Sequence, residues 1–452
     1  MATKNTMTEG TPWKHILKFA FPVLGSYILQ QLYATTDSII VGNFTGEEAL
    51  AAVGTTGTVM YFCLALAMGF SAGNGVVVSQ AFGAKDEKMM RAGASSGILF
   101  VLSVGLLCAV VCSCLSKYIY ADFMATPPEI LGLSLEYFNI CMVGLTFLYG
   151  YNIFSSILLA VGDSAATLYF QIIATVVNIV LDLIFVAYFK WGVAGAAWAT
   201  SISHMFSCIA AFLYMRHKHP EFRFKLSEYK WDNKLIWLTV KMGFPIALQA
   251  ALVAVGIGAI IRAVNSFGKH MTASFAVAHR IELILILPAQ VFQTALATYA
   301  GQNIGAGKMD RVKLGAKAGV SMAFGFGLII ASLVCFFTKD IINIFALSEQ
   351  AGVYCFQHIR TAAFVNLLLA FVFPVTGIIQ GAGHSSFATF VAIIALIARV
   401  GSTYLFIDSS FFGYQIIWWN TFWGFAAATL ITLPYYISGR WQNNSAVLNS
   451  IK

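Results

Sequence analysis

Long apolar stretches recur along the whole chain, and they constrain its fold more than any other feature. Continuous runs such as 98–114 and 166–186 have the length of a helix that crosses about 30 Å of hydrocarbon. The 452 residues are 59% hydrophobic and only 10% charged, and no soluble core could bury so much apolar surface. A membrane barrel would instead alternate polar and apolar residues over segments of about ten. We therefore predict an all-α membrane protein with twelve transmembrane helices.

The net charge of +8 indicates topology rather than a nucleic-acid partner, because Lys and Arg gather in the cytoplasmic loops of membrane proteins. In a twelve-span layout most basic residues, including the run 216–234, fall on the side that holds both termini. Those that fall on the opposite side are Lys117, Lys190, Lys269 and Lys339. We expect a multi-pass protein of the plasma membrane with cytoplasmic N- and C-termini and no nucleic-acid partner.

The sequence repeats itself at an offset of about 222 residues, which is the mark of a duplicated structural unit. Phe21-Pro22 returns as Phe244-Pro245, and Val161-Gly162-Asp163-Ser164 returns as Ala382-Gly383-His384-Ser385. Each half holds an even number of spans, so both halves enter the membrane in the same orientation. The repeat is therefore parallel.

This repeat sets the expected domain organisation. We predict an N-lobe over 1–215, a basic cytoplasmic linker over 216–235, a C-lobe over 236–437 and a cytoplasmic tail over 438–452. Two parallel six-helix bundles around a central cavity are typical of secondary transporters, whose binding sites lie near the interface between repeats. A receptor or a channel subunit has less need of this plan.

The chain lacks the motifs of an enzyme or of a cofactor-binding protein. Its eight Cys residues are scattered through apolar segments without CxxC spacing, and we interpret them as buried packing thiols. The stretch 301–308 is similar to a phosphate-binding loop, but Gln302 occupies the position of the first glycine and Met309 follows Lys308. We expect no cofactor and no catalytic residue.

Polar and ionisable side chains inside the predicted spans are functional candidates, because a charge at the membrane centre costs about 2.5 to 3.5 kcal/mol. Asn178 lies one turn before Asp182 on the same helix face, and helical rise puts Asp37 and Thr200 at a similar depth. If these four groups meet, their oxygens suit Na⁺, and a carboxylate in a low dielectric can carry H⁺ instead. The alternative is that both carboxylates reach the outer membrane interface.

Several motifs, taken together, resemble those of a known family. They are Thr36-Asp37-Ser38, Ala49–Gly54, Tyr299–Lys308 followed by Asp310-Arg311, and Gln380–Gly383. With the twelve-span layout, they make the chain resemble the multidrug and toxic compound extrusion (MATE) family over nearly its whole length. The resemblance implies two six-helix bundles forming a V, and export of organic cations and drugs against an inward flow of H⁺ or Na⁺.

The resemblance also implies roles for particular residues. The N-lobe cation-binding residues of prokaryotic members are matched here by Asp37, Asn178, Asp182 and Thr200. The resemblance to these members implies a location in the bacterial inner membrane. Na⁺ or H⁺ is then the coupling ion expected at these four residues. The repeat places Arg399 opposite Asn178, so we do not expect a matching Na⁺ site in the C-lobe.

Further residues are candidates for lining a substrate cavity, namely Gln30, Tyr33, Arg262, Arg280 and Arg399. Gln30 and Tyr33 share one helix face with Asp37, which would point into a cavity or else serve packing. Pro22 permits a kink that would gate the site, and a static kink explains it equally well.

The arginines of the second half are a separate question. Arg280 lies beside His279 and Glu282 in the predicted eighth span. Mutual pairing or reaching to the interface is one interpretation of these cations. The other is that one of them recognises an anionic headgroup or pairs with a carboxylate in the cavity.

These observations predict a cation-coupled antiporter that exports amphipathic, cationic organic compounds by alternating access. We expect a monomer whose partners are small molecules and membrane lipids. A flippase for lipid-linked precursors is the alternative within the same superfamily, because the second-half arginines could hold a pyrophosphate. A membrane-embedded enzyme is a third class, which chemical turnover of the transported compound would reveal.

Overall fold

The computed structural model describes residues 7–345 and 347–442, and it contains helices and turns but no strand in these ranges. The long helices are α1 (Pro12–Thr45), α2 (Glu47–Gly83), α3 (Glu87–Lys117), α4 (Pro128–Ala160), α5 (Ser164–Asp182), α6 (Gly192–Lys218), α7 (Asn233–Ser266), α8 (Lys269–Gly305), α9 (Met309–Phe336), α11 (Glu349–Gly381), α12 (Ser385–Phe406) and α13 (Ile416–Ile437). The all-α prediction is confirmed. Most of the predicted tail, 443–452, lies outside the described residues.

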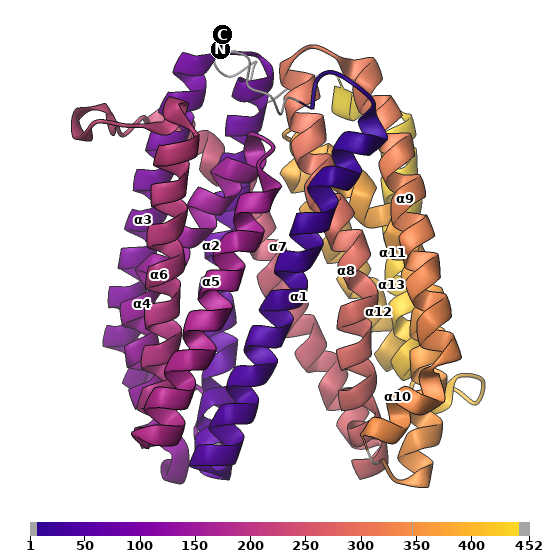
Figure 1. Ribbon diagram of the computed structural model, residues 1–452. Coiled ribbons are helices and arrows are strands. Elements are labelled where there is room, and N and C mark those ends of the chain that lie inside the picture. The colour runs from indigo at the N-terminus through magenta and orange to yellow at the C-terminus, as the bar shows by residue number, and fades with distance from the viewer. Residues whose placement is uncertain (1–6, 346, 443–452) are drawn as a thin grey trace. The chain divides into compact units, whose positions relative to one another are not determined.

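Short helical turns lie between some of these helices or follow the last of them (Figure 1). They are the π-helical turns η1 (Tyr118–Phe123) and η2 (Leu183–Tyr188), the 3₁₀ turns η3 (Pro220–Phe222), η4 (Leu226–Glu228), η5 (Gly413–Gln415) and η6 (Arg440–Gln442), and the short helix α10 (Thr338–Ile344). Among the described helices, 11 are long and apolar enough to cross a membrane. The remaining long helix, α1, carries Lys14 and Lys18 near its start and Asp37 in its second half.

The helices repeat in length and order, which confirms the internal duplication. α1 and α7 both have 34 residues, α2 and α8 both have 37, and α4 and α11 both have 33. The turns repeat as well, since Gly46 and Gly268 begin α2 and α8 with φ values of 89° and 84°. Residues with a side chain rarely adopt this backbone conformation, so both copies use glycine there.

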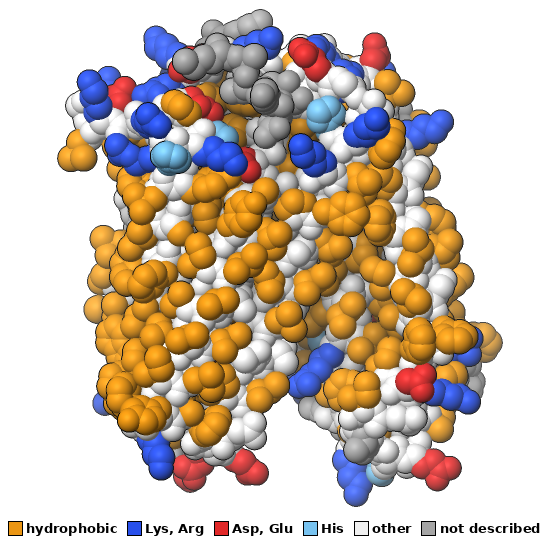
Figure 2. All heavy atoms as spheres, in the orientation of Figure 1, with side chains coloured by type: hydrophobic (Ala, Val, Ile, Leu, Met, Phe, Trp, Pro, Cys, Tyr) orange, Lys and Arg blue, Asp and Glu red, His pale blue; other side chains and the backbone are white. Residues whose placement is uncertain are grey.

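Hydrophobic side chains cover the middle of the helices in each unit, whereas charged side chains gather towards the helix ends (Figure 2). Exposed apolar residues are frequent along these middles, for example Leu106, Leu107 and Val110 on α3. Large apolar surfaces of this kind are stable only in a hydrocarbon environment. The chain is therefore a multi-pass membrane protein.

The chain divides into two compact units, and both α1 and α7 contribute to each of them. Unit 1 holds Phe21–Ala247, and unit 2 holds Met7–Ala20 together with the chain from Leu248 onwards. The first turns of α1 therefore belong to unit 2, and the first turns of α7 belong to unit 1. Pro22 and Pro245 lie close to these two changes of unit, where each removes one helical hydrogen bond.

Residues before α1 are hydrogen-bonded to the end of α8, the start of α9 and the loop between them in unit 2. The Met7 amide donates to Gln302 Oε1 at 3.0 Å, and Lys308 Nζ donates to the Thr8 carbonyl at 3.0 Å. Arg311 donates to the carbonyls of Met7, Glu9 and Gly10 at 2.9 to 3.1 Å. One guanidinium thus satisfies three backbone acceptors, which explains why this segment joins unit 2.

The start of α7 packs against α2 in unit 1. Asn74 Nδ2 donates to Thr239 Oγ1 at 3.2 Å, and an added Cβ at Gly73 would lie 2.5 Å from the Gly243 nitrogen. The two backbones approach so closely that only glycine fits at Gly73. Small residues of this kind allow membrane helices to pack tightly.

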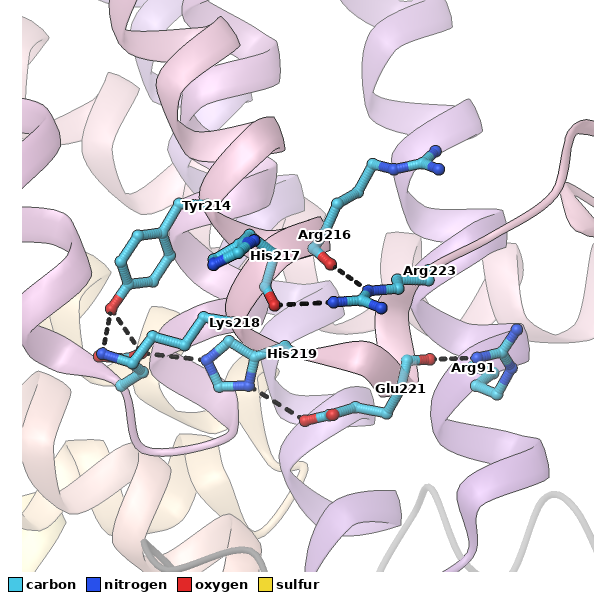
Figure 3. A network of polar contacts seen from close by, with 9 residues as sticks. Arg91, Tyr214, Arg216, His217, Lys218, His219, Glu221 and Arg223 are labelled. Atoms are coloured by element: carbon cyan, nitrogen blue, oxygen red, sulfur yellow. Dashed lines mark hydrogen bonds and ion pairs between the residues drawn. The ribbon is translucent and has the colours of Figure 1, made fainter.

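A polar network ties the linker after α6 to the loop between α4 and α5 in unit 1 (Figure 3). His219 bonds to Asp163 Oδ2 through Nε2 and to Glu221 Oε1 through Nδ1, both at 3.0 Å, and Tyr214 donates to Asp163. Burial opposes a charged imidazole, but the hydrogen bonds that His219 donates to the two carboxylates outweigh this effect and raise the pKa of His219 to about 9. His219 is therefore a cation at neutral pH.

Candidate ion-binding site in unit 1

The structure brings together the four polar residues that the sequence singled out in the first half. Asp37 of α1, Asn178 and Asp182 of α5 and Thr200 of α6 are all buried, with exposed fractions of 8%, 0%, 0% and 9%. The carboxyl groups of Asp37 and Asp182 lie close enough for each to act on the other, and Asn178 lies against Asp182. The four residues form one site, and their role as ion ligands remains a prediction.

Tyr33 joins this group from α1, one turn before Asp37. Its hydroxyl donates to Thr200 Oγ1 at 3.3 Å, which links α1 to α6. The same hydroxyl lies near enough to the carboxyl groups of Asp37 and Asp182 to feel their charge. Tyr33 therefore faces the site, as the shared helix face with Asp37 predicts.

Several buried polar atoms of the site have no hydrogen-bond partner among the described residues. They are Asp37 Oδ1, both carboxyl oxygens of Asp182, and the side-chain oxygen and nitrogen of Asn178. Buried polar groups are almost always hydrogen-bonded, because burial without a partner costs free energy. A cation or a proton shared between the carboxylates would satisfy these oxygens.

An apolar cluster closes the site on the side of the helix ends near Gly46 and Gly192. Val41 lies one turn beyond Asp37, and Val186 lies one turn beyond Asp182, and both belong to one buried cluster. Val193, Tyr137 and Cys141 are further members of this cluster. The carboxylates therefore sit in a low-dielectric environment, where charge interactions are strong.

Asp182 is the last α-helical residue of α5, and the π-helical turn η2 follows it at once. A π-helical turn holds more residues than an α-helical one and shifts the following side chains around the axis. Such turns occur often at functional sites. No sequence signal predicted this change of helix type.

Two further residues lie near the site and were not among the candidates that the sequence indicated. His204 lies one turn after Thr200 on α6, and its ring stacks beside that of Tyr33 with 6.3 Å between centroids. Tyr137 of α4 is buried, and its hydroxyl lies within the electrostatic range of Asp37. The four-residue spacing from Thr200 would have found His204, whereas nothing in the sequence indicates which helix faces α1 at Tyr137.

The other candidate residues for the substrate cavity are described within their own units. Gln30 is exposed on α1, and Arg262 and Arg280 are exposed on α7 and α8. Arg399 is in unit 2, where its Nε donates to Asn420 Oδ1 at 2.8 Å. Arg399 thus bonds to a neutral amide, and it also interacts electrostatically with Glu282 of α8.

The donor set of the site is made of oxygens. No group of three or more His, Cys, Asp or Glu side chains in the described residues has the arrangement of a metal site. An ion held by Asp37 and Asp182 would therefore need the neutral oxygens of Asn178, Thr200 or Tyr33 as well. That set fits Na⁺, a hard cation, and a shared proton equally well.

Comparisons with known proteins agree with this architecture. The family model MatE matches residues 22–184 and 245–405, one segment in each repeat. The chain is 30% identical to the probable multidrug resistance protein YpnP of Bacillus subtilis (strain 168), covering 96% of this chain and 97% of that protein. It is 29% identical to the probable multidrug resistance protein YoeA of the same organism, covering 76% of this chain and 75% of that protein.

A solved structure entitled "Crystal structure of MATE in complex with MaL6" has the same fold, with a TM-score of 0.91 at 22% identity. It covers 97% of this chain, and this chain covers 98% of it. Fold, repeat and sequence matches together define a secondary transporter rather than an enzyme. The chain belongs to the multidrug and toxic compound extrusion family, which confirms the resemblance in its motifs.

Proposed function

We propose that this protein is a cation-coupled antiporter that exports amphipathic, cationic organic compounds by alternating access. The observation that carries the proposal is the buried pair of Asp37 and Asp182 in unit 1, with its unpartnered oxygens. The names of the relatives YpnP and YoeA, both described as probable multidrug resistance proteins, support the class of exported compound.

The pair of carboxylates gives a physical basis for coupling. Two negative charges side by side in a low dielectric repel each other strongly, so the site favours a state in which a cation or a proton compensates them. A ligand shifts a conformational equilibrium only by its difference in affinity for the two states. An ion that binds Asp37 and Asp182 more tightly in one state would therefore drive the transporter towards that state.

The coupling ion is either Na⁺ or H⁺, and the two differ in what they require of the site. Na⁺ needs several oxygens, which Asn178, Thr200 and Tyr33 supply besides the carboxylates. A proton needs only Asp37 and Asp182. Whether the coupling ion is Na⁺ or H⁺, it lowers the affinity for the exported cation when the site faces outwards. The reason is that the coupling ion and the exported cation compete for the same negative charge.

The substrate cavity remains a proposal that includes Gln30, Tyr33, Arg262, Arg280 and Arg399. Tyr33 is the member that contacts the ion site directly, through Thr200. An aromatic ring beside two carboxylates suits an aromatic organic cation, because the ring face attracts positive charge. Tyr33 is thus the residue through which the exported compound and the coupling ion would sense each other.

The same proposal includes a place and an orientation. We propose a monomer in the bacterial inner membrane with cytoplasmic termini. The support is the enrichment of Lys and Arg around the linker after α6, for example Arg216, Lys218 and Arg223. Labelling of single cysteines in the linker and at Gly46 with a membrane-impermeant reagent tests this orientation.

The decisive experiment uses the purified full-length protein in sealed vesicles loaded with ethidium. Na⁺ and pH gradients are imposed separately, and export is compared between wild type, Asp37→Asn and the control Asp340→Asn, which changes an exposed carboxylate on α10. We expect export under one or both gradients in wild type and in Asp340→Asn, and its loss in Asp37→Asn. Unchanged gradient-driven export by Asp37→Asn would refute the site.

A further inference from the structure

Unit 2 contains a buried carboxylate held between two histidines. Glu282 of α8 is 5% exposed, and its oxygens lie 3.1 Å from His358 Nε2 on α11 and 3.2 Å from His279 Nδ1 on α8. We infer that this cluster is a proton-binding site, in which His279 takes up the proton and Glu282 provides the counter-charge. Its use in transport rests on the function proposed above, whereas its protonation can be measured independently.

The two histidines differ in what their second nitrogen meets. His358 is almost completely buried, and its Nδ1 has no hydrogen-bond partner among the described residues. A carboxylate only accepts hydrogen bonds, so His358 Nε2 carries the hydrogen that points at Glu282. A second hydrogen on Nδ1 would be a buried donor without a partner, which costs free energy. The geometry therefore fits His358 as a fixed donor to Glu282 through Nε2.

His279 is in a different position, because its side chain is 28% exposed. Its Nδ1 faces Glu282, and its ring is stacked on Phe275 with 5.6 Å between centroids and 4° between planes. A cation over an aromatic face and beside a carboxylate is stabilised by both. A proton that arrives from water at Nε2 of His279 would therefore form an ion pair with Glu282.

Other charged groups near the cluster come from the neighbouring helices. Arg399 of α12 acts electrostatically on Glu282 while its Nε is bonded to Asn420 of α13. Arg280, next to His279, is exposed, and the guanidinium of Arg360 on α11 lies over the ring of Phe356. α13 contributes the neutral Trp418, whose ring stacks on His358.

The side of α8 that faces α9 and α11 is apolar beside the cluster. Ile281 and Leu285 belong to a buried cluster with Ala331 of α9 and Ile359 of α11, which also includes the thiol of Cys355. His279, with 28% of its side chain exposed, is the member of the cluster around Glu282 that water can contact most easily, because His358 and Glu282 are buried. The partly exposed imidazole of His279 would accept the proton from water, and the buried carboxylate of Glu282 would supply the negative charge that stabilises it.

The chemistry of the cluster selects a proton and not Na⁺. Na⁺ prefers several oxygen ligands. In this cluster Glu282 is accompanied by two imidazoles, and Arg399 adds a positive charge nearby. Unit 1 offers the opposite set, with two carboxylates, an amide and a hydroxyl. The transporter would thus respond to pH through unit 2 even where Na⁺ is the ion bound in unit 1.

The protonation is tested by nuclear magnetic resonance on the full-length protein with ¹³C-labelled histidine, purified in detergent micelles. Spectra of wild type, His279→Gln and His358→Gln assign the two rings by loss of a signal. Spectra are recorded over a pH series from about 5 to 8.5. We expect the His279 signal to change from the neutral to the protonated form on acidification, and the His358 signal to show its hydrogen on Nε2 towards Glu282. A His279 ring that stays neutral over this range would overturn the inference.

The role in transport is tested in vesicles at equal pH on both sides, with export driven by a Na⁺ gradient at a series of pH values from about 6 to 8.5. We expect ethidium export to change with pH in the wild type. It should change in the same way in the control His217→Gln, which removes an exposed histidine at the end of α6. His279→Gln, which keeps an amide donor towards Glu282, should lose this dependence.

A pH profile of His279→Gln identical to that of His217→Gln would overturn the role of the cluster. If wild type exports under neither a Na⁺ nor a pH gradient, the proposed function fails, and the titration of His279 still decides whether the proton site exists. Thermal unfolding of each variant checks that a lost profile does not reflect a misfolded protein. If His279→Gln does not fold, His279→Asn replaces it in the same comparison.

Discussion

Asp37 and Asp182 come from different helices of unit 1 and face each other one turn inside an apolar layer that contains Val41 and Val186. The two carboxylates are paired with each other, and the apolar layer separates them from the nearer helix ends. Most of the consequences that can be tested follow from this pairing or from the contacts that hold unit 1 together.

The first prediction concerns stabilisation by the coupling ion. Because a bound cation compensates Asp37 and Asp182, saturating Na⁺ or acid pH should raise the melting temperature of the wild type. At about 100 times the dissociation constant the gain is about 2.7 kcal/mol. The measurement is thermal unfolding in detergent, with choline chloride replacing NaCl at constant ionic strength. Asp182→Asn should lose most of this gain, and an equal gain in the variant would argue against the pairing.

The second prediction concerns Tyr33, whose hydroxyl donates to Thr200. Tyr33→Phe removes this hydrogen bond but keeps the ring, so the ion affinity should fall by a modest amount corresponding to about 0.5 to 1.5 kcal/mol. Titration of the melting temperature with the ion measures the affinity. Tyr61→Phe, which changes a tyrosine on α2 outside the site, is the control.

The third prediction concerns the close approach of α2 and α7 in unit 1. Gly73→Ala would place its Cβ 2.5 Å from the backbone nitrogen of Gly243, so the helices must separate. We expect a loss of about 1 to 3 kcal/mol in the free energy of unfolding. Gly57→Ala on the same helix is the matched control, because its Cβ meets nothing within 4 Å. Equal stability of the two variants would contradict the packing.

The fourth prediction concerns pH and His219. Since its folded-state pKa of about 9 lies above the unfolded value near 6.5, the ion pairs with Asp163 and Glu221 stabilise the protein fully below about pH 6.5. This stabilisation should decline as the pH rises and be lost above about pH 9. Unfolding temperatures of wild type and His219→Gln from about pH 6 to 10 should therefore converge at the alkaline end.

The fifth prediction concerns the anchoring of the segment before α1. Arg311→Ala removes donors to the carbonyls of Met7, Glu9 and Gly10, so the amides of residues 7–11 should exchange their hydrogen faster. Hydrogen exchange followed by mass spectrometry measures this. Lys313→Ala, which changes an exposed cation on α9, should leave the exchange unchanged. Slow exchange in both variants would show that other contacts hold the segment.

Much of this structure follows from local patterns in the sequence. Apolar length gives the helices, and the offset between Pro22 and Pro245 gives the duplication, because each repeat folds by the same local rules. The similar depth of Asp37 and Asp182 could be anticipated from helical rise along each helix, but not that the two side chains face each other.

Other features depend on which helices become neighbours, and periodicity does not encode this. Tyr137 and the bond between His358 and Glu282 belong to this class, because each joins helices far apart in the sequence. The fastening of Met7 to Gln302 is another case. A hydrogen bond across nearly 300 residues leaves no local trace in either segment.

The exchange of helix ends between the units has a consequence for assembly. Residues 7–20 complete unit 2, and the beginning of α7 completes unit 1, so neither half of the chain carries all the pieces of its own bundle. A fragment ending after α6 would leave the surface of Gly69 and Gly73 without the backbone of Gly243 that covers it. We therefore expect neither unit to complete its folding during biosynthesis until the other half of the chain has supplied the missing segment.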